Sequence, residues 1–456
     1  MTTSEMGTTI FALGILLAST QLIGYLFEQL RQPRFVGEIL TGVLLGPFVL
    51  GHLAPSFSTA IFGNPADAKT NGVFGFIYWF GLLLLMFISG THVRRVLSQE
   101  NRRQTLWLLG VGTPIPFFLV LAAGLLALLP MESLIGPSGN QTAALLILSI
   151  AVAITSIPVI SRIFYDLKIL HTRFASLILG FAMIEDIILW AVLAIATALA
   201  KTAVAQQNLV NDIAVHVSIT VAYMTFGLLM APRLLKKFHV SRWNALHKSS
   251  AMAYVISVLF AYIAIATVLE VNLIFAAFLA GFGVVGGMDG EERTRFSKVL
   301  DSIEHFSTSV FIPIYFTMVG YKLVFGKAFS FSLLFYFLVG STFLTLLARG
   351  LAAKFAKFNG LDMLNIAITS NARGGPGIVL ASVAYEAGII SASFYTALVL
   401  TAVLTSQMAQ VWLRYVLTKG WSLLSNYPEE TWSVADTKGE APHATPAATP
   451  ASAAIT

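Results

Sequence analysis

Long apolar segments follow one another along almost the whole chain, with short polar connections between them. Backbone groups inside a bilayer must be hydrogen-bonded within the protein, so segments of this length become α-helices. The sequence therefore predicts an all-α polytopic membrane protein with about thirteen transmembrane helices. The predicted segments are 7–30, 34–51, 73–93, 105–129, 141–166, 173–200, 210–234, 248–270, 272–287, 308–325, 329–355, 361–386 and 392–418.

The composition agrees with a membrane protein. Charged residues make up 11% of the chain, whereas soluble domains carry about 25%. Cysteine is absent, which excludes thiolate metal sites. The first apolar stretch has neither a basic start nor a small-residue cleavage site, so we expect a retained span rather than a removed signal peptide.

The basic residues are distributed unevenly between the connections. Most of the 28 Lys and Arg fall in alternate connections, and HVRRVLSQENRRQ alone carries four arginines. The positive-inside rule then places the N-terminus outside and the C-terminus in the cytoplasm, as in a bacterial inner membrane. The net charge of +6 thus reflects topology, and we expect no nucleic-acid partner.

Three short sequences recur, in the same order, seven segments further along the chain. An odd offset reverses the orientation of the second copy, which predicts an inverted-topology repeat. The repeats would cover about 7–200 and 248–418, joined by a linking helix at 210–234, within a membrane domain of 1–420 and a polar tail of 421–456. The pairs are ILTGVLLG (39–46) with FLAGFGVV (278–285), LMFISG (85–90) with YFTMVG (315–320), and AITS at 153–156 and 367–370.

Helix-breaking residues follow both copies of AITS. Proline removes a backbone donor and glycine loosens the backbone, so each helix can break there. A single proline kink is the simpler alternative for either site alone. Corresponding breaks in both repeats instead predict two broken helices that cross at a binding site. The breakers are Pro158 after the first copy, and Gly374, Gly375 and Pro376 after the second.

Two adjacent carboxylates interrupt the apolar segment LILGFAMIEDIILWAVLAIATALA. Glu185 and Asp186 would each cost about 3 kcal/mol at the centre of a bilayer helix, and charge at that depth usually marks an ion or proton path. A buried carboxylate binds a proton or a metal cation, but not both together. The alternative is a structural ion pair with Arg349 or Arg373, the two arginines that fall within predicted spans.

Further polar residues are candidates for the same site. Thr155 and Ser156 at the first break could offer oxygen ligands to a hard cation. Arg349 could neutralise Glu185 or extend to the membrane surface, and Arg373 could offset the negative end of a half-helix. Glu38 and His216 are interpreted as structural. The GFGVVG sequence at 281–286 fits a dinucleotide pattern, but it lies in an apolar span and indicates close helix packing.

The ordered series of motifs resembles the cation:proton antiporter superfamily, in its second branch of sodium/proton antiporters and potassium-efflux proteins. The motifs are QPRFVGEILTGVLLGP, FGLLLLMFISG, AITSIPVISRI, GFAMIEDIILWAVLA, FIPIYFTMVG and NARGGPGIVLASV. The resemblance implies thirteen helices, a homodimer, and a core that moves like an elevator. It also implies Asp186 as the ion carrier, Glu185 as the partner of Arg349, and Thr155 and Ser156 at the cation site.

The function that we expect is antiport of a monovalent cation for protons by alternating access. Na⁺ is favoured and K⁺ is the alternative, with no cofactor beyond the transported ions. A gated cation channel is the alternative of another class, disfavoured because the sequence lacks a repeated filter loop. A carrier of organic ions with the same fold stays open. An intramembrane aspartyl protease is disfavoured, because Glu185 and Asp186 are neighbours rather than on facing helices.

Overall fold

The computed structural model describes residues 2–30, 32–62, 68–93, 102–170, 172–204, 209–240, 244–286, 290–326 and 329–425. Within these ranges the chain is almost entirely helical and contains no strand, only one isolated bridge between Ile135 and Ile390. Nine helices of this described part are long and apolar enough to cross a membrane. The all-α polytopic class is confirmed. The count of thirteen stays a prediction, because several predicted segments are divided between shorter helices.

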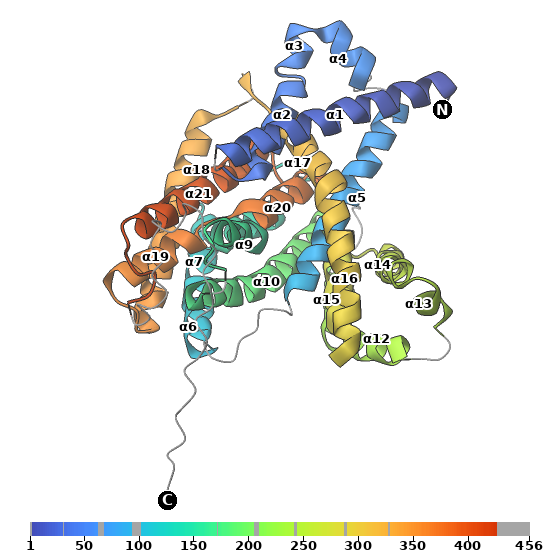
Figure 1. Ribbon diagram of the computed structural model, residues 1–456. Coiled ribbons are helices and arrows are strands. Elements are labelled where there is room, and N and C mark those ends of the chain that lie inside the picture. Colours follow the sequence, from blue (N-terminus) through green and yellow to red (C-terminus); the bar gives the residue numbers. More distant parts are fainter. Residues whose placement is uncertain are drawn as a thin grey trace, which may run out of the picture.

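The helices form two groups that pack mainly within themselves, joined through α11 (Leu209–Thr225) and a π-helical turn at Phe226–Met230 (Figure 1). The first group holds α1 (Thr3–Gln29), α2 (Arg34–Leu45), α3 (Leu50–Leu53), α4 (Pro55–Phe62), α5 (Ala68–Val93), α12 (Ala231–Val240), α13 (Ala245–Ser249), α14 (Ala251–Val268), α15 (Leu273–Gly286), α16 (Gly290–Phe306) and α17 (Ile312–Tyr321). The second holds α6 (Arg102–Gly112), α7 (Pro114–Leu125), α8 (Gln141–Ala153), α9 (Ile157–Asp166), α10 (Arg173–Val204), α18 (Phe331–Phe355), α19 (Gly360–Ser370), α20 (Gly374–Glu386) and α21 (Ala392–Thr418).

Side-chain caps mark where several of these helices begin. Asn140, Ser250, Ser330 and Ser391 each accept a hydrogen bond from a backbone N–H in the first turn of the helix that follows. Such a cap satisfies a donor that has no partner within the helix. Four helices therefore start where a polar residue precedes an apolar run.

Two pairs of helices in the first group cross at contacts that only glycine permits. A Cβ on Gly42 of α2 would overlap a carbonyl oxygen of α17, and one on Gly320 of α17 would overlap a carbonyl of α2. Gly90 of α5 and Gly281 of α15 meet in the same way. The predicted repeat pairs Gly42 with Gly281 and Gly90 with Gly320. In this repeat α2 corresponds to α15 and α17 corresponds to α5, so the two glycine crossings occupy equivalent places. The limits of the repeats stay a prediction.

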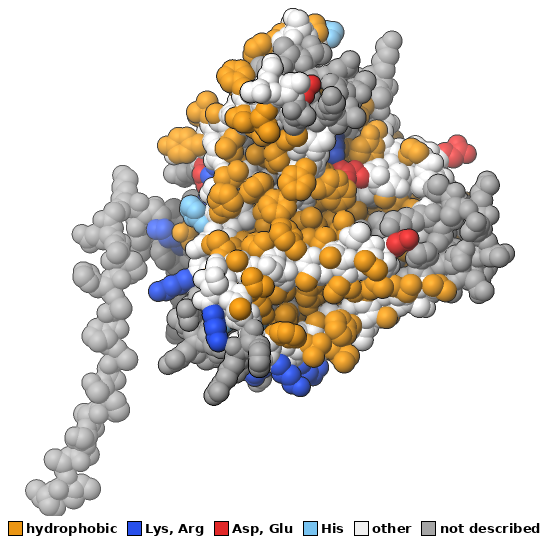
Figure 2. Space-filling view, turned by 90° about the vertical axis from the view of Figure 1, so that its right-hand side faces the viewer, with side chains coloured by type: hydrophobic (Ala, Val, Ile, Leu, Met, Phe, Trp, Pro, Cys, Tyr) orange, Lys and Arg blue, Asp and Glu red, His pale blue; other side chains and the backbone are white. Residues whose placement is uncertain are grey.

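A broad apolar surface covers one face of the molecule (Figure 2). Figure 2 shows hydrophobic side chains gathered across the middle of one face, with most lysine and arginine side chains towards one end. Such a surface is unfavourable in water and suits contact with lipid. Helix α18, which lies at the left of Figure 1 and so away from the face in Figure 2, also exposes apolar side chains: Phe331, Phe335, Tyr336, Val339, Phe343, Leu347, Leu351 and Phe355.

Some sequence predictions fall beyond the described residues. The basic connection at 94–101 lies outside them, and so does the tail after Ser425. Within the described start of the tail, Ser425 donates hydrogen bonds to the buried carboxylate of Asp362 in α19. The side chain of His216 is also outside the described part of the chain.

Candidate ion-binding site

The two helix breaks lie against each other in the second group. The first separates α8 from α9, and the second separates α19 from α20. Two hydrogen bonds join them directly. The Ser156 N–H donates to the carbonyl oxygen of Ala372 at 2.8 Å, and the Thr155 hydroxyl donates to that of Ser370 at 2.6 Å. The two predicted broken helices therefore cross, and backbone groups released by one break are satisfied by the other.

Local sequence explains why both helices break here. Proline in the first turn of α9 has no N–H to continue α8, and Ile154 between them is extended. At the second break Gly374 has a φ of +26°, and a Cβ there would overlap the Val159 side chain. The Gly374 N–H donates instead to the Ser406 hydroxyl of α21 at 3.2 Å.

Arg349 of α18 connects the acidic pair to the first break. Both Arg349 and Glu185 are 0% exposed, and Arg349 Nη2 lies 2.5 Å from Glu185 Oε1. The same nitrogen donates to the Ala153 carbonyl oxygen at 2.8 Å and to the Thr155 hydroxyl at 3.2 Å. Arg349 thus neutralises a buried carboxylate and also meets the negative end of half-helix α8. The ion pair is present, and its role in transport stays a prediction.

Thr113 is a member of this cluster that the sequence analysis did not identify. It lies between α6 and α7, and its hydroxyl donates a hydrogen bond to Glu185 Oε1. The signal that could have revealed it is GTPIP at 112–116, a third helix-breaking sequence within an apolar span.

Asp186 differs sharply from its neighbour. It is 0% exposed, and neither of its carboxylate oxygens has a hydrogen-bond partner among the described residues. The Ser156 hydroxyl at the first break is also buried without a hydrogen-bond partner, and the buried Ser89 hydroxyl of α5 faces Asp186. A buried carboxylate without a partner is costly and calls for a ligand, such as a proton or a cation. Its helix, α10, packs against all four half-helices of the two breaks.

Arg373 turns to α18 rather than to the acidic pair. It is 3% exposed and donates to the hydroxyls of Ser341 at 2.6 Å and Thr345 at 3.2 Å. It also donates to the Asn371 side chain at 3.3 Å, beside the end of α19. None of the described carboxylates forms an ion pair with it. The structure therefore keeps Arg373 within the crossing but does not bring it onto Glu185 or Asp186.

Glu38 has a local explanation. It is buried in α2, and Arg34 lies one turn earlier with its Nε 3.3 Å from Glu38 Oε1. This contact within one helix agrees with the structural interpretation of Glu38.

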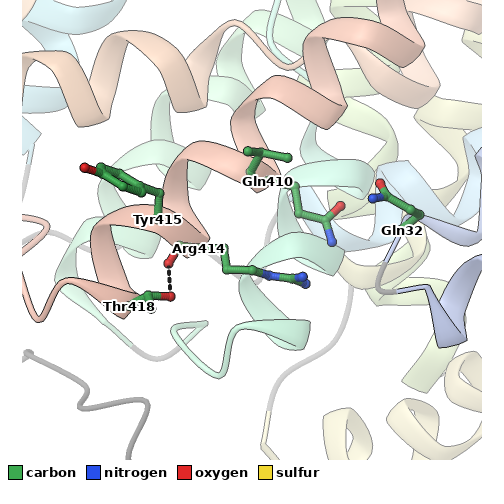
Figure 3. A pocket seen from close by; sticks show the side chains of 6 residues that line it. Gln32, Gln410, Arg414, Tyr415 and Thr418 are labelled. Carbon is green, nitrogen blue, oxygen red and sulfur yellow. Dashed lines mark hydrogen bonds between the residues drawn. The ribbon is translucent and has the colours of Figure 1, made fainter.

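A separate pocket lies where α21 approaches the residues that follow α1. Its volume is about 370 Å³, and none of its lining residues belongs to the cluster around Asp186. In Figure 3 the Arg414 side chain extends towards Gln32, and the Thr418 hydroxyl donates to the Arg414 carbonyl at 2.7 Å. The lining residues are Gln32, Gln410, Val411, Arg414, Tyr415 and Thr418.

Two crossed broken helices around a buried carboxylate are features of secondary transporters. A family model described as "Sodium/hydrogen exchanger, transmembrane" matches residues 15–419 of the chain. The chain therefore belongs to the sodium/hydrogen exchanger family of membrane proteins.

Individual relatives are distant but cover most of the chain. It is 24% identical to Cation/H(+) antiporter 17 of Arabidopsis thaliana over 90% of its own length and 48% of the relative. It is also 24% identical to the Na(+)/H(+)-K(+) antiporter GerN of Bacillus cereus, over 89% of this chain and 95% of GerN. The chain spans about half the length, or less, of the plant and yeast relatives that it matches.

A solved structure has the same fold. The sodium proton antiporter MjNhaP1 from Methanocaldococcus jannaschii superposes with a TM-score of 0.61, at 14% identity. The match covers 90% of this chain and 98% of MjNhaP1. At this identity the likeness shows the fold alone, and it agrees with the polytopic helical fold expected from the motif series.

Proposed function

We propose that the protein exchanges a monovalent cation, Na⁺ in the first place, for protons by alternating access, with Asp186 as the carrier. The observation that carries this proposal is the contrast within the acidic pair. Glu185 is neutralised by Arg349, whereas Asp186 is equally buried and has no partner for either oxygen. One carboxylate is thus committed to the protein and the other is available to a transported ion.

The ligands proposed for the cation are oxygen atoms around the first break. Asp186 supplies the charge, and the Ser156 hydroxyl, which has no partner, supplies a neutral oxygen. The Thr155 hydroxyl is engaged with Ser370 and Arg349, so Thr155 would join the site after the crossing rearranges. A proton and a cation compete for Asp186, and this competition couples their opposite movements.

The relatives support cation/proton exchange as a class and do not decide between Na⁺ and K⁺ as the cation. GerN is named for both Na⁺ and K⁺, so K⁺/H⁺ antiport is the second candidate. We further propose a homodimer in a bacterial inner membrane, with the N-terminus outside and the C-terminus in the cytoplasm. The charge asymmetry of the connections supports that orientation.

The test is proton movement in proteoliposomes that carry an internal pH dye. Addition of Na⁺, K⁺ or Li⁺ in turn, with and without a clamped membrane potential, should produce cation-dependent proton movement. Asp186→Asn should abolish it, because an amide can neither ionise nor exchange a proton. Asp301→Asn on α16 is the matched control and should leave exchange intact. Wild-type exchange in the Asp186→Asn variant would refute the carrier assignment.

A further inference from the structure

An ion pair joins the two helix groups where α17 and α20 end. Lys322 follows the last residue of α17, in the first group, and Glu386 is the last residue of α20, in the second. Lys322 Nζ lies 2.5 Å from Glu386 Oε1, with side-chain exposures of 30% and 20%. The same ammonium group lies 3.8 Å from the centre of the Tyr78 ring of α5. A carboxylate and an aromatic face thus hold one cation between the groups.

Further side-chain contacts join α17 to the second group near this ion pair. The Tyr395 hydroxyl of α21 donates to the Val319 carbonyl oxygen of α17 at 3.0 Å. Tyr315 of α17 has its ring centre 5.3 Å from that of Tyr78, and its hydroxyl lies 3.5 Å from the Ser382 hydroxyl of α20. The backbone of α17 packs mainly on α2 and α5, and that of α20 mainly on α21 and α9. Side chains rather than close backbone packing therefore connect α17 to α20.

Helix α20 connects this contact to the ion site. It begins at Gly374 in the second break and runs for 13 residues, about 20 Å, to Glu386. Residues 374–384 are all buried, so the helix is packed along almost its whole length and should move as a rigid unit. A rearrangement of the crossing that moves α20 relative to α17 must therefore separate Glu386 from Lys322.

A pocket beside Glu386 lies between the two groups, with a volume of about 470 Å³. It reaches Ala194 of α10, and about two helical turns separate Ala194 from Asp186. Within those turns Trp190 is 0% exposed, and its ring lies 6.3 Å from that of Phe278 in α15, a helix of the first group. The pocket therefore leads towards Asp186 and is closed where the two groups meet.

We infer that Lys322 and Glu386 form a latch that keeps this route closed, and that the latch must open for Asp186 to exchange its ion with the outer solution. This inference rests on the proposed function and its orientation, in which α17 and α20 end at the outer side. Lys322 and Glu386 are positioning residues, because they act on access to Asp186 and not on the ion itself. Loss of either charge favours the open route. Because the pair is partly exposed, the preference for the closed state should fall by a factor of about 2–5.

The first test measures how fast a thiol in the pocket reacts, and it does not depend on transport. The chain has no cysteine, so Ala194→Cys introduces a single thiol at a position that is 2% exposed. Purified protein in detergent is treated with a neutral maleimide, whose local concentration does not depend on nearby charges. We expect Lys322→Gln and Glu386→Gln each to raise the rate of modification by a factor of about 2–5, and the double variant to raise it no further.

Two further variants show whether the charges themselves hold the latch. Lys322→Glu/Glu386→Lys exchanges the charges and should restore the slow rate, because the pair forms again with opposite polarity. Arg162→Gln is the matched control. It breaks the ion pair between Arg162 of α9 and Glu28 of α1, which also joins the two groups, and neither residue lines the pocket. It should not raise the rate of modification.

The second test joins the two groups covalently. In Lys322→Cys/Glu386→Cys, a bifunctional thiol reagent with a reducible linker should stop cation-dependent proton movement in proteoliposomes, and reduction of the linker should restore it. Ser330→Cys/Ser393→Cys is the control, because both residues belong to the second group and the Ser330 N–H donates to the Ser393 hydroxyl at 3.3 Å. Linking this pair should leave exchange intact.

The outcomes separate the latch from the proposed function. Unchanged modification rates in Lys322→Gln and Glu386→Gln overturn the latch even if Asp186→Asn abolishes exchange, and so does full exchange in the linked Lys322→Cys/Glu386→Cys variant. Full exchange in Asp186→Asn overturns the proposed function. In that case the modification rates still decide whether the ion pair controls access to the pocket.

Discussion

Replacing Arg349 by glutamine removes the positive charge that faces Glu185 and keeps a side chain that can donate hydrogen bonds. Both members of the ion pair are 0% exposed, so solvent screens their interaction little. Removing one member of a buried pair leaves an uncompensated charge and costs about 3–5 kcal/mol. Arg349→Gln also weakens the contacts to Ala153 and Thr155 at the first break. We therefore expect a loss of stability at the upper end of that range.

The assay measures the free energy of unfolding of the purified protein in detergent. The wild type, the single variants Arg349→Gln and Glu185→Gln, and the double variant Glu185→Gln/Arg349→Gln together form a double-mutant cycle. Each single variant leaves one member of the pair charged without its partner, whereas the double variant removes both charges of the pair. The loss in the double variant should therefore be clearly smaller than the sum of the two single losses. Arg162→Gln is the control. Its pair with Glu28 is partly exposed, with side-chain exposures of 49% and 30%, and should contribute about 1 kcal/mol or less. If Arg349→Gln is no more harmful than Arg162→Gln, or the single losses simply add, the account of the ion pair is wrong.

Two further predictions concern the packing that supports the site, and thermal unfolding in detergent measures both. Gly42→Ala places a methyl group against the Thr317 backbone, which cannot move aside easily, and should destabilise the protein by about 1–3 kcal/mol or more. Gly14→Ala has open space around it and should be neutral or slightly stabilising; equal effects of the two would contradict the close crossing. Thr155→Val removes a donor to Ser370 and an acceptor for Arg349, and should cost about 1–3 kcal/mol. A loss no larger than that of Thr267→Val, whose hydroxyl donates to Ile263 in its own helix, would show that the Thr155 hydroxyl does not support the crossing.

The crossed breaks could be predicted because their cause is local. Proline and glycine alter the backbone wherever they occur, so AITSIP and AITSNARGGPG indicated both breaks before any contact was known. The acidic pair was equally visible, because a carboxylate in an apolar run is improbable without a role. Short stretches of sequence are therefore enough to predict the two breaks and the acidic pair.

The partners within the site could not be predicted in the same way. Arg349 and Arg373 both fall within predicted spans, yet only Arg349 meets Glu185. The reason is that α6 packs against both α18 and α10, which brings Arg349 of α18 to Glu185 of α10. The hydroxyl of Thr155 was expected at the cation site. Instead it donates a hydrogen bond to the carbonyl oxygen of Ser370 at the second break, 215 residues away along the chain. Thr113 was missed because the GTPIP sequence lies outside the repeated motifs. Pairings of this kind depend on helix packing, which periodicity does not encode.

The charges buried around the crossing suggest why Glu185 is paired with Arg349 while Asp186 is left for the transported ion. Arg349 and Arg373 carry two positive charges, and Glu185 and Asp186 carry two negative charges when both are ionised. These charges cancel, so a bound proton and a bound monovalent cation each leave this cluster with one net positive charge. Under the proposed function, moving the cluster across the membrane field would then require the same electrostatic work with either ligand. Under the proposed function, a core whose Glu185 stays paired with Arg349 carries one cation in one direction and one proton in the other.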